Sequence, residues 1–501
     1  MPTTRRALLG GTAALLAAPH ITLAQNAGTA LVIGVVSDPV TLDPAFSASF
    51  FETQVIYNLH ETLLVARPDG TVAPGLAEIT AVDPLRYRLT LRENLTFHDG
   101  TKLDAAAVKA NIDRYTDPAV GSIRRADFGP LKEVTVTGPL TVELVLSAPY
   151  APMPLVLTNR AGMMVSPTAV MKLGADFATQ AVGCGPWKLL SWTKNAELVL
   201  EKFPGYWQGA PKNFDRLVYR PLSDETVRLA NLRSGTLQLI DGVPPQAVSG
   251  LARETGVRVA EMPSLGFNAF AFNCTRKPFD DARVRRAFTA AIDPGVIQRV
   301  VYFGTGRVSH GPLSPAVPWA FDEAQKGISF DPVRAQAMLA ESGAATPVPV
   351  AITVTNSPQM VRIAQVLQAQ AGAAGFKVEV KQIDPTSLIT VLRNRDFDLC
   401  MAPWSGRYDP DGNLFNYFTA RGPNNFAGLD MPEVTTLLEK ARSEADRPIR
   451  ATLYHQAQAK LVESAPMLFL HFDAILQASS ARLRWTQYPD GVFRLFDAVL
   501  S

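Results

Sequence analysis

The chain has 501 residues, of which 47% are hydrophobic and 19% charged, a composition typical of a globular protein with two or three domains and not of a disordered or fibrous one. Its 48 basic and 46 acidic side chains leave a formal charge of +2. The first 24 residues carry two arginines and no acid, so a chain without them would have 46 of each and no net charge. Neutrality argues against nucleic acid or an anionic membrane as a partner.

Residues 1–24 have the features of an export signal. Arg5 and Arg6 precede a short apolar run at 13–18, and small residues lead up to a cleavage position after Ala24. The apolar run is too short to span a bilayer. The paired arginines resemble the twin-arginine signal, and an ordinary Sec signal that carries two arginines is the alternative. Either signal predicts a periplasmic protein that is soluble once the signal is removed.

Alternating side chains predict β-strands in the first third of the chain. Apolar and polar residues alternate over 87–92, and again over 141–146 after a turn at Gly138-Pro139. A period of two with polar partners indicates strands with one buried face. Between these runs, Asp104 is the expected N-cap of a helix whose apolar residues recur at helical spacing.

Acidic caps predict further helices in the second half of the chain. Asp280 or Asp281, Asp293 and Asp331 each precede apolar residues at helical spacing. The last two are followed by proline, which favours the first position of a helix. Gly343 is expected to end the helix that begins after Asp331, because glycine readily takes the left-handed conformation found there.

A βαβαβ pattern occupies residues 348–402. Strands are predicted at 350–355, 376–380 and 397–402, with helices at 358–375 and 386–395 between them. Strands separated by helices of this length imply a parallel, doubly wound sheet. In such sheets ligands bind beyond the carboxyl ends of the strands. The segments that follow two of these strands, 355–357 and 404–411, are therefore candidate binding loops.

The histidines and cysteines form no recognisable catalytic or metal site. No HExxH, P-loop, GxSxG or GxGxxG motif stands in a suitable context, so we predict no catalytic residue, no metal and no cofactor. Cys184, Cys274 and Cys400 are odd in number and fit no zinc site, and a bridge between the last two is left open. A secreted hydrolase whose catalytic residues lie far apart in sequence is the alternative.

Several segments in order resemble the family 5 extracellular solute-binding proteins, which include dipeptide-, oligopeptide-, glutathione- and nickel-binding proteins. The similar segments are Pro74-Gly75-Leu76-Ala77-Glu78, Phe97-His98-Asp99-Gly100, Gly183-Cys184-Gly185-Pro186-Trp187, Leu232-Arg233-Ser234-Gly235 and the run from Pro278 to Ala287. The third segment looks like the family's Gly-Thr-Gly-Pro-aromatic turn, with Cys184 in place of the usual threonine. The resemblance covers essentially the whole chain after the export signal.

The resemblance implies an α/β, two-lobed periplasmic-binding-protein fold of type II with three domains. The first α/β lobe would comprise 25–56, 182–265 and 478–501, with a smaller accessory domain at 57–181 and a second α/β lobe at 266–477. Such proteins bind a small molecule in the cleft between the lobes and close on it. The closed form is delivered to the permease subunits of an ABC importer in the inner membrane. A monomer without enzymatic activity is expected, and a chaperone-like or signalling receptor on the same fold is a weaker alternative.

Segments that follow strands supply the candidate ligand-binding residues. The candidates are Phe46, Ser49, Phe50, Asn356, Trp404, Ser405, Arg407, Tyr408 and Asp409. We expect the other tryptophans, such as Trp192, Trp207 and Trp485, in the core and not in the cleft.

Arg407 is the most informative candidate. In the peptide-binding relatives, an aspartate near this position pairs with the α-amino group of the peptide. The dipeptide binders also carry an arginine at the end of the strand that matches 350–355, where this chain has Asn356. We therefore hypothesise that Arg407 faces the cleft and pairs with an anionic group. Asp409 or Asp411 either holds the guanidinium group in place or caps the next helix. The alternative is that Arg407 points to solvent or packs on Tyr408.

The export signal predicts that the mature protein begins at or near Gln25. N-terminal sequencing of protein recovered from the periplasm should find this residue or a close neighbour. Functional protein that still begins with Met1 would contradict the prediction.

Overall fold

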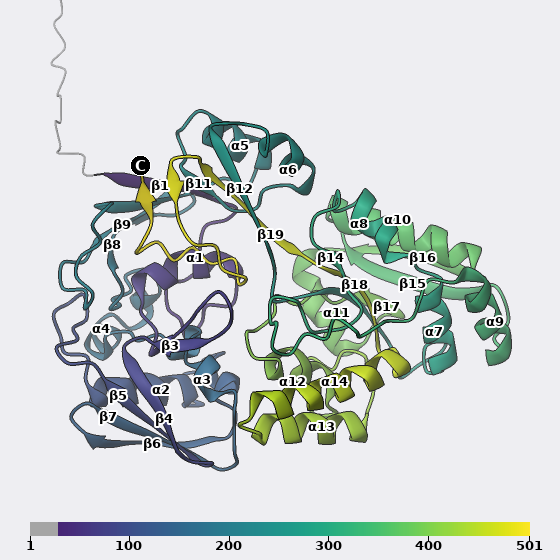
Figure 1. Cartoon of the computed structure of the whole chain (residues 1–501), viewed down its shortest axis with the longest axis horizontal. Coiled ribbons are helices and arrows are strands. Elements are labelled where there is room, and N and C mark those ends of the chain that lie inside the picture. Colours follow the sequence, from purple (N-terminus) through teal and green to yellow (C-terminus); the bar gives the residue numbers. More distant parts are fainter. Residues whose placement is uncertain (1–28) are drawn as a thin grey trace, which may run out of the picture.

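The computed structural model describes residues 29–501, and the predicted export signal at 1–24 lies outside the described residues. Figure 1 shows two lobes side by side. The elements from β1 to β12 (purple to teal) and the last strands, β19 to β21 (yellow), form one lobe, and the elements from β13 to β18 form the other. Both lobes combine helices with sheets, so the α/β class predicted from the sequence is confirmed.

The first lobe is built on a seven-stranded mixed sheet in the order β12-β19-β11-β1-β10-β9-β8. Its strands are β1 (Ala30–Val35), β8 (Trp187–Thr193), β9 (Glu197–Lys202), β10 (Arg216–Pro221), β11 (Leu239–Ile240), β12 (Val257–Pro263) and β19 (Ala474–Ser480). The central strand β1 runs parallel to β10 and β11, whereas the outer pairs are antiparallel. One face of this sheet packs on α1 (Phe50–Leu59) in a core that includes the buried Trp187.

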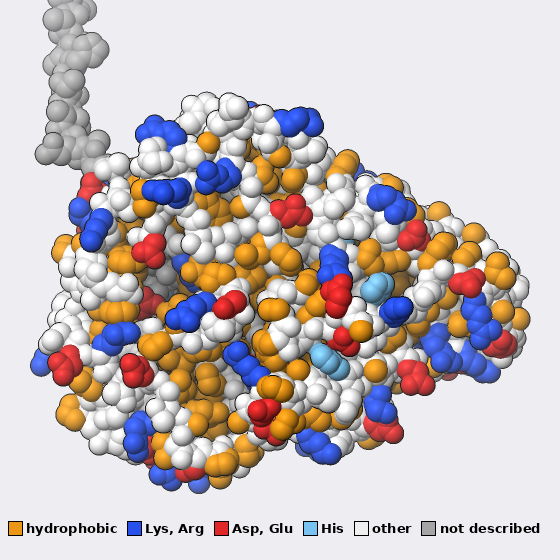
Figure 2. All heavy atoms as spheres, in the orientation of Figure 1, with side chains coloured by type: hydrophobic (Ala, Val, Ile, Leu, Met, Phe, Trp, Pro, Cys, Tyr) orange, Lys and Arg blue, Asp and Glu red, His pale blue; other side chains and the backbone are white. Residues whose placement is uncertain are grey.

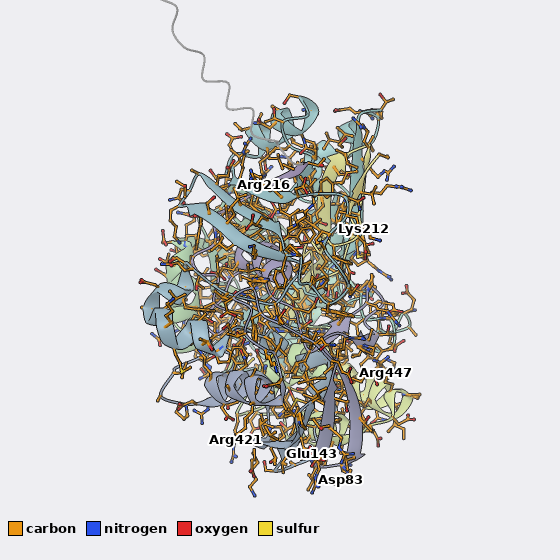
Figure 3. The ribbon with its side chains drawn as sticks, turned by 90° about the vertical axis from the view of Figure 1, so that its left-hand side faces the viewer. Asp83, Glu143, Lys212, Arg216, Arg421 and Arg447 are labelled. Carbon is orange, nitrogen blue, oxygen red and sulfur yellow. The ribbon has the colours of Figure 1, made fainter. Side chains whose placement is uncertain are left out.

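The accessory part of this lobe has a four-stranded antiparallel sheet in the order β4-β5-β7-β6. Its elements are β4 (Ala77–Asp83), β5 (Arg86–Leu91), β6 (Leu131–Gly138), β7 (Thr141–Leu146) and the covering helix α2 (Ala105–Thr116). The two runs with alternating side chains pair with each other as β5 and β7. Asp104 caps α2, as predicted, by accepting the N–H of Ala107. Asp83 and Glu143 lie at the far end of this sheet (Figure 3), where they pair with neighbouring arginines.

The second lobe has a six-stranded sheet in the order β14-β18-β13-β17-β15-β16. Its strands are β13 (Asn268–Phe272), β14 (Arg307–Val308), β15 (Val348–Thr355), β16 (Phe376–Ile383), β17 (Leu399–Met401) and β18 (Met467–Phe472). β15 runs parallel to β16 and to β17, with α10 (Pro358–Ala373) and α11 (Leu388–Asn394) as the connections. The predicted βαβαβ unit is therefore present.

The remaining elements connect and cover these sheets. They are the helices α3 (Met153–Val156), α4 (Pro167–Leu173), α5 (Glu225–Arg233), α6 (Pro245–Leu251), α7 (Ala282–Ala290), α8 (Pro294–Val300), α9 (Pro332–Ser342), α12 (Asp411–Phe418), α13 (Pro432–Ser443) and α14 (Arg447–Ser464), and the strands β2 (Leu64–Ala66), β3 (Val72–Pro74), β20 (Leu483–Arg484) and β21 (Val499–Leu500). The predicted caps Asp281, Asp293 and Asp331 begin α7, α8 and α9, and Gly343 ends α9 with a φ of +75°.

Two chain crossings join the lobes. β12 of the first sheet leads into β13 of the second, and β18 leads back into β19 with only Asp473 between them. The two crossings are tied together, because the Ser264 N–H donates to the Asp473 carbonyl (2.9 Å) and the Asn268 amide donates to the Asp473 carboxylate (2.7 Å). The predicted lobe boundary after 477 falls within β19, close to this return crossing.

The surface and the cysteines add two observations. Basic and acidic side chains are interspersed over the face shown in Figure 2. Cys184, Cys274 and Cys400 are free thiols, so the bridge left open between the last two is not formed. Among residues 29–501, no helix is long and apolar enough to cross a membrane.

Helix α1 fastens the end of the chain to the first lobe. Asn58 is 1% exposed, and its amide group donates to the Phe493 carbonyl and accepts the Leu495 N–H at 3.1 Å. One turn earlier, Gln54 donates to the Gly491 carbonyl and accepts the Phe493 N–H, both at 3.0 Å. These two amides satisfy backbone groups of a segment without regular structure, which would otherwise be buried without partners.

We expect Asn58→Leu to lower the free energy of unfolding by about 2–4 kcal/mol, because it leaves a buried N–H and a buried carbonyl of the C-terminal segment unpaired. Denaturant unfolding followed by circular dichroism measures the change. Asn231→Leu is the matched control, since its amide makes one solvent-accessible bond to Val227 within α5. The prediction would be contradicted if Asn58→Leu, like the control, changed the free energy of unfolding by less than about 0.5 kcal/mol.

Candidate ligand-binding site

A cavity of about 210 Å³ lies between the two lobes. The first lobe lines it with α1, with parts of 126–160 and with Asp490 and Val492 near the C-terminus. The second lobe lines it with the loop 404–412 that follows β17 and with residues of α12 and α13, and Leu265 in the crossing from β12 to β13 lines it as well. Both lobes therefore contribute walls, and a molecule held here would contact both.

Six of the nine predicted residues line this cavity and three do not. The six are Phe50, Trp404, Ser405, Arg407, Tyr408 and Asp409. Ser49 instead stands at the start of α1, where its N–H donates to Glu52, and Phe46 lies beside the guanidinium group of Arg114. Asn356 continues the pairing of β15 with β16 by donating its N–H to Ile383 at 3.0 Å. It lies away from the cavity because β17, and not β15, is the neighbour of the crossing strand β13.

The loop after β17 is held in place by its backbone and by one buried amide. Gly406 has a φ of +80°, and a Cβ atom there would lie 2.1 Å from the carbonyl carbon of Leu265. Only glycine fits such a position. The Asn413 side chain, which is buried at the start of α12, accepts N–H bonds from Arg407 and from the Trp404 indole, both at 2.8 Å, and donates to the Arg407 carbonyl at 3.0 Å. Asn413 was not among the predicted residues.

Arg407 is half-buried at the cavity wall. Its guanidinium carbon lies 4.5 Å from the centre of the Trp404 ring, and its Nη1 donates to the Gly406 carbonyl at 2.7 Å. Its Nε and Nη2 atoms donate to no residue within 29–501, and no carboxylate of that range lies within 4.0 Å. Burial lowers the pKa of Arg407, and the negative charge of Asp127 partly offsets this effect. The side chain thus stacks on Trp404, where we had considered solvent or Tyr408.

Arg160 is a second arginine of the cavity that the sequence analysis did not identify. It is 8% exposed and follows α3 in the accessory part of the first lobe. Its Nη1 donates to the Ser47 and Ser49 carbonyls at 3.3 and 3.2 Å, and its buried Nε has no hydrogen-bond partner among the described residues. Burial, together with the positive charges of Arg124 and Arg407, lowers the pKa of Arg160 to about 10.

Every aspartate that lines the cavity has an arginine of its own. The pairs are Asp127 with Arg124 (3.0 Å), Asp409 with Arg450 (2.8 Å), Asp411 with Arg442 (2.9 Å) and Asp490 with Arg494 (2.7 Å). Asp409 and Asp411 therefore do not hold the guanidinium group of Arg407. They stand at the start of α12, where Asp409 accepts the Asp411 N–H, as the alternative role at the next helix predicted. Six arginines stand against four aspartates, which leaves Arg160 and Arg407 without a direct carboxylate partner. The buried Glu52 carboxylate reaches Arg160 only through the Ser47 hydroxyl group, which bonds to both.

The cavity offers recognition groups and no metal site. Within the described part of the chain, no three His, Cys, Asp or Glu side chains are grouped so that they could hold a metal ion. The walls combine aromatic rings, at Phe50, Tyr57, Tyr150 and Trp404, with the two free guanidinium groups. Guanidinium groups in a water-poor site bind carboxylates and phosphates in a bidentate manner.

Comparisons with known proteins agree with this architecture. The sequence model of the bacterial extracellular solute-binding proteins, family 5, matches residues 71–426. A glutathione-binding protein of Pectobacterium atrosepticum is 29% identical over 517 aligned positions, which cover 98% of this chain and 97% of that protein.

Solved structures give the same result for the fold. An ABC transporter substrate-binding protein of Listeria monocytogenes superposes with a TM-score of 0.85 at 22% identity and covers 94% of this chain and 99% of that one. A dipeptide-binding protein of Pseudoalteromonas in complex with Met-Leu gives 0.82 at 23% identity, covering 94% and 100%. These neighbours confirm the two-lobed fold that the resemblance implied. The chain belongs to the bacterial extracellular solute-binding proteins of family 5.

Proposed function

We propose that this protein captures a small molecule with an anionic group between its lobes and delivers it to the permease subunits of an ABC importer. The observation that carries the proposal is the pair of arginines, one from each lobe, that line the cavity without a carboxylate partner. Two uncompensated cations in a half-buried site are unfavourable alone, and a carboxylate or similar group on the ligand would neutralise them. The predicted export signal supports a periplasmic location for this step.

The charges of the cavity argue against an unmodified dipeptide. A dipeptide needs a carboxylate for its α-ammonium group, and each of the four aspartates that line the cavity is already engaged by an arginine. A peptide-like molecule with additional acidic groups fits better. Glutathione, for which the Pectobacterium relative is named, shares the α-ammonium group of a dipeptide but has a second carboxylate, so that its two carboxylates match the two arginines.

The size of the cavity limits the ligand. Its volume of about 210 Å³ is below the range of about 300–1,000 Å³ that is typical for drug-sized ligands. A small solute therefore fits the closed cleft, while a long peptide does not. Family 5 proteins are transport binding proteins, so we expect the ligand to be released unchanged.

Ligand binding should raise the stability of the folded protein. At a ligand concentration about a hundred times the dissociation constant, the expected gain is about 2.7 kcal/mol. A thermal-shift screen of peptides, acidic amino-acid conjugates and sugars, combined with native mass spectrometry of protein purified from its host, would identify the ligand. Conversion of a compound to product during the screen would instead favour the hydrolase alternative.

Removal of Arg407 should weaken binding of the ligand so identified. We expect Arg407→Ala to cost about 2–5 kcal/mol of binding free energy, because the ligand's charge is then left buried without its partner. Isothermal titration calorimetry measures the loss. Arg299→Ala is the control, since Arg299 is exposed on α8 and far from the cavity residues. Unchanged affinity in Arg407→Ala, or tight binding of an unmodified dipeptide to the native protein, would refute the proposal.

A further inference from the structure

Arg160 and Arg407 belong to opposite lobes, and only closure brings them together. Arg160 follows α3 in the accessory part of the first lobe, and Arg407 stands in the loop after β17 of the second. Both line the same cavity of about 210 Å³. In Figure 1 α3 faces α12 and α13 across the gap between the lobes, away from the crossing strands β12 and β19. Rotation about the two crossings would therefore separate the arginines.

The charge of Arg407 acts on Arg160 across the cavity. The positive charge of Arg407 is one of the causes that depress the pKa of Arg160, after burial and the charge of Arg124. Asp127 screens the pair in part although it is bound to Arg124, and the other three aspartates of the cavity are bound to arginines of their own. Closing an empty cleft thus brings two like charges into a poorly hydrated space.

Apolar packing and two polar contacts oppose this repulsion where the accessory part of the first lobe meets the second. Ala66 and Leu155 of the first lobe are buried in one hydrophobic cluster with Leu414 of the second. The Ala151 N–H of the first lobe donates to the Arg442 carbonyl of α13 at 2.8 Å. The Arg442 guanidinium carbon also lies 5.2 Å from the centre of the Tyr150 ring. A hydrogen bond and a cation–π contact of this kind are each small enough to be offset by one repulsive charge pair.

We propose that Arg160 and Arg407 select the ligand by its charge, because they make closure of the lobes conditional on an anion that bridges them. The preferred ligand carries two negative charges, as a dicarboxylate or a phosphate ester does, since this number matches the two uncompensated arginines. A neutral molecule of the same shape fits the walls and leaves the repulsion in place, so the lobes do not stay closed on it. This inference rests on the proposed function and adds to it the step at which specificity arises.

Small-angle X-ray scattering of the ligand-free mature chain tests the proposal without knowledge of the ligand. The native protein should be open, with a radius of gyration larger than that calculated from the closed structure. Arg407→Gln and Arg160→Gln should each raise the ratio of closed to open molecules about tenfold, a change of the size that one charge pair produces at the effective dielectric constant of a protein surface. Arg407→Lys keeps the charge and should stay open.

Sulfate serves as the probe for the bridging anion. Sulfate should compact the native protein at concentrations where chloride of equal ionic strength does not, and Arg407→Gln should lose this response. Arg334→Gln, an exposed arginine of α9 paired with Glu341, is the control for loss of one positive charge and should behave as the native protein does. Circular dichroism and the melting temperature verify that each variant is folded.

Three results would overturn the proposal: a ligand-free native protein that is already closed, an Arg407→Gln protein as open as the native one, or compaction by sulfate that is the same in both. These results are distinct from failure of the proposed function. If Arg407→Gln closes without ligand while no anionic compound stabilises the native protein, the proposed ligand class is wrong and the charge dependence of closure stands. If Arg407→Ala loses affinity for an anionic ligand but the glutamine variants do not close, the proposed ligand class stands and the charge dependence of closure is wrong.

Discussion

The two chain crossings between the sheets determine where everything else in the molecule can act. β12 of the first lobe continues into β13 of the second, and β18 of the second lobe continues into β19 of the first. β12 pairs with β19, and β13 pairs with β18, so one pair of strands in each lobe is continuous with a pair in the other. The crossings are bound to each other through Asp473. This arrangement leaves rotation about the crossings as the soft motion, and it places the loop after β17, the neighbour of β13, against the first lobe.

The balance of charge in the cavity follows from this geometry. Four arginine–aspartate pairs fix the walls, and each of them lies within one lobe, as Arg442–Asp411 does between α13 and the start of α12. Such pairs hold side chains in position but leave no net charge for a ligand. Arg160 and Arg407 bond only to carbonyl and hydroxyl oxygens, so their charges are the ones available to a molecule in the cleft.

Local patterns predicted the elements, and long-range pairing could not be predicted. Some features depend only on neighbouring residues, so a local sequence pattern predicts them. Examples are the helix caps Asp104 and Asp331 and the βαβαβ unit. Arg407 could be proposed because a strand end and a family motif both point to it. Arg160 sits in a short turn with no periodic pattern, and its position depends on Ser47, 113 residues away. Asn356 was misplaced since the strand-end rule does not say which strand faces the other lobe.

The loop that carries Arg407 also explains how such a site can change its ligand without changing its fold. Asn413 bonds to the N–H and to the carbonyl of residue 407, and Gly406 supplies the turn, so the backbone is fixed by groups that every amino acid shares. The Arg407 side chain contributes only a stacking contact with Trp404 and a bond to the adjacent carbonyl. Replacing an acidic side chain with a basic one at this position would therefore invert the charge offered to the ligand while the loop, α12 and the cavity walls keep their places. In this architecture, single side chains on a rigid backbone determine which ligand charge the site accepts. Proteins with similar folds can therefore bind ligands of different charge.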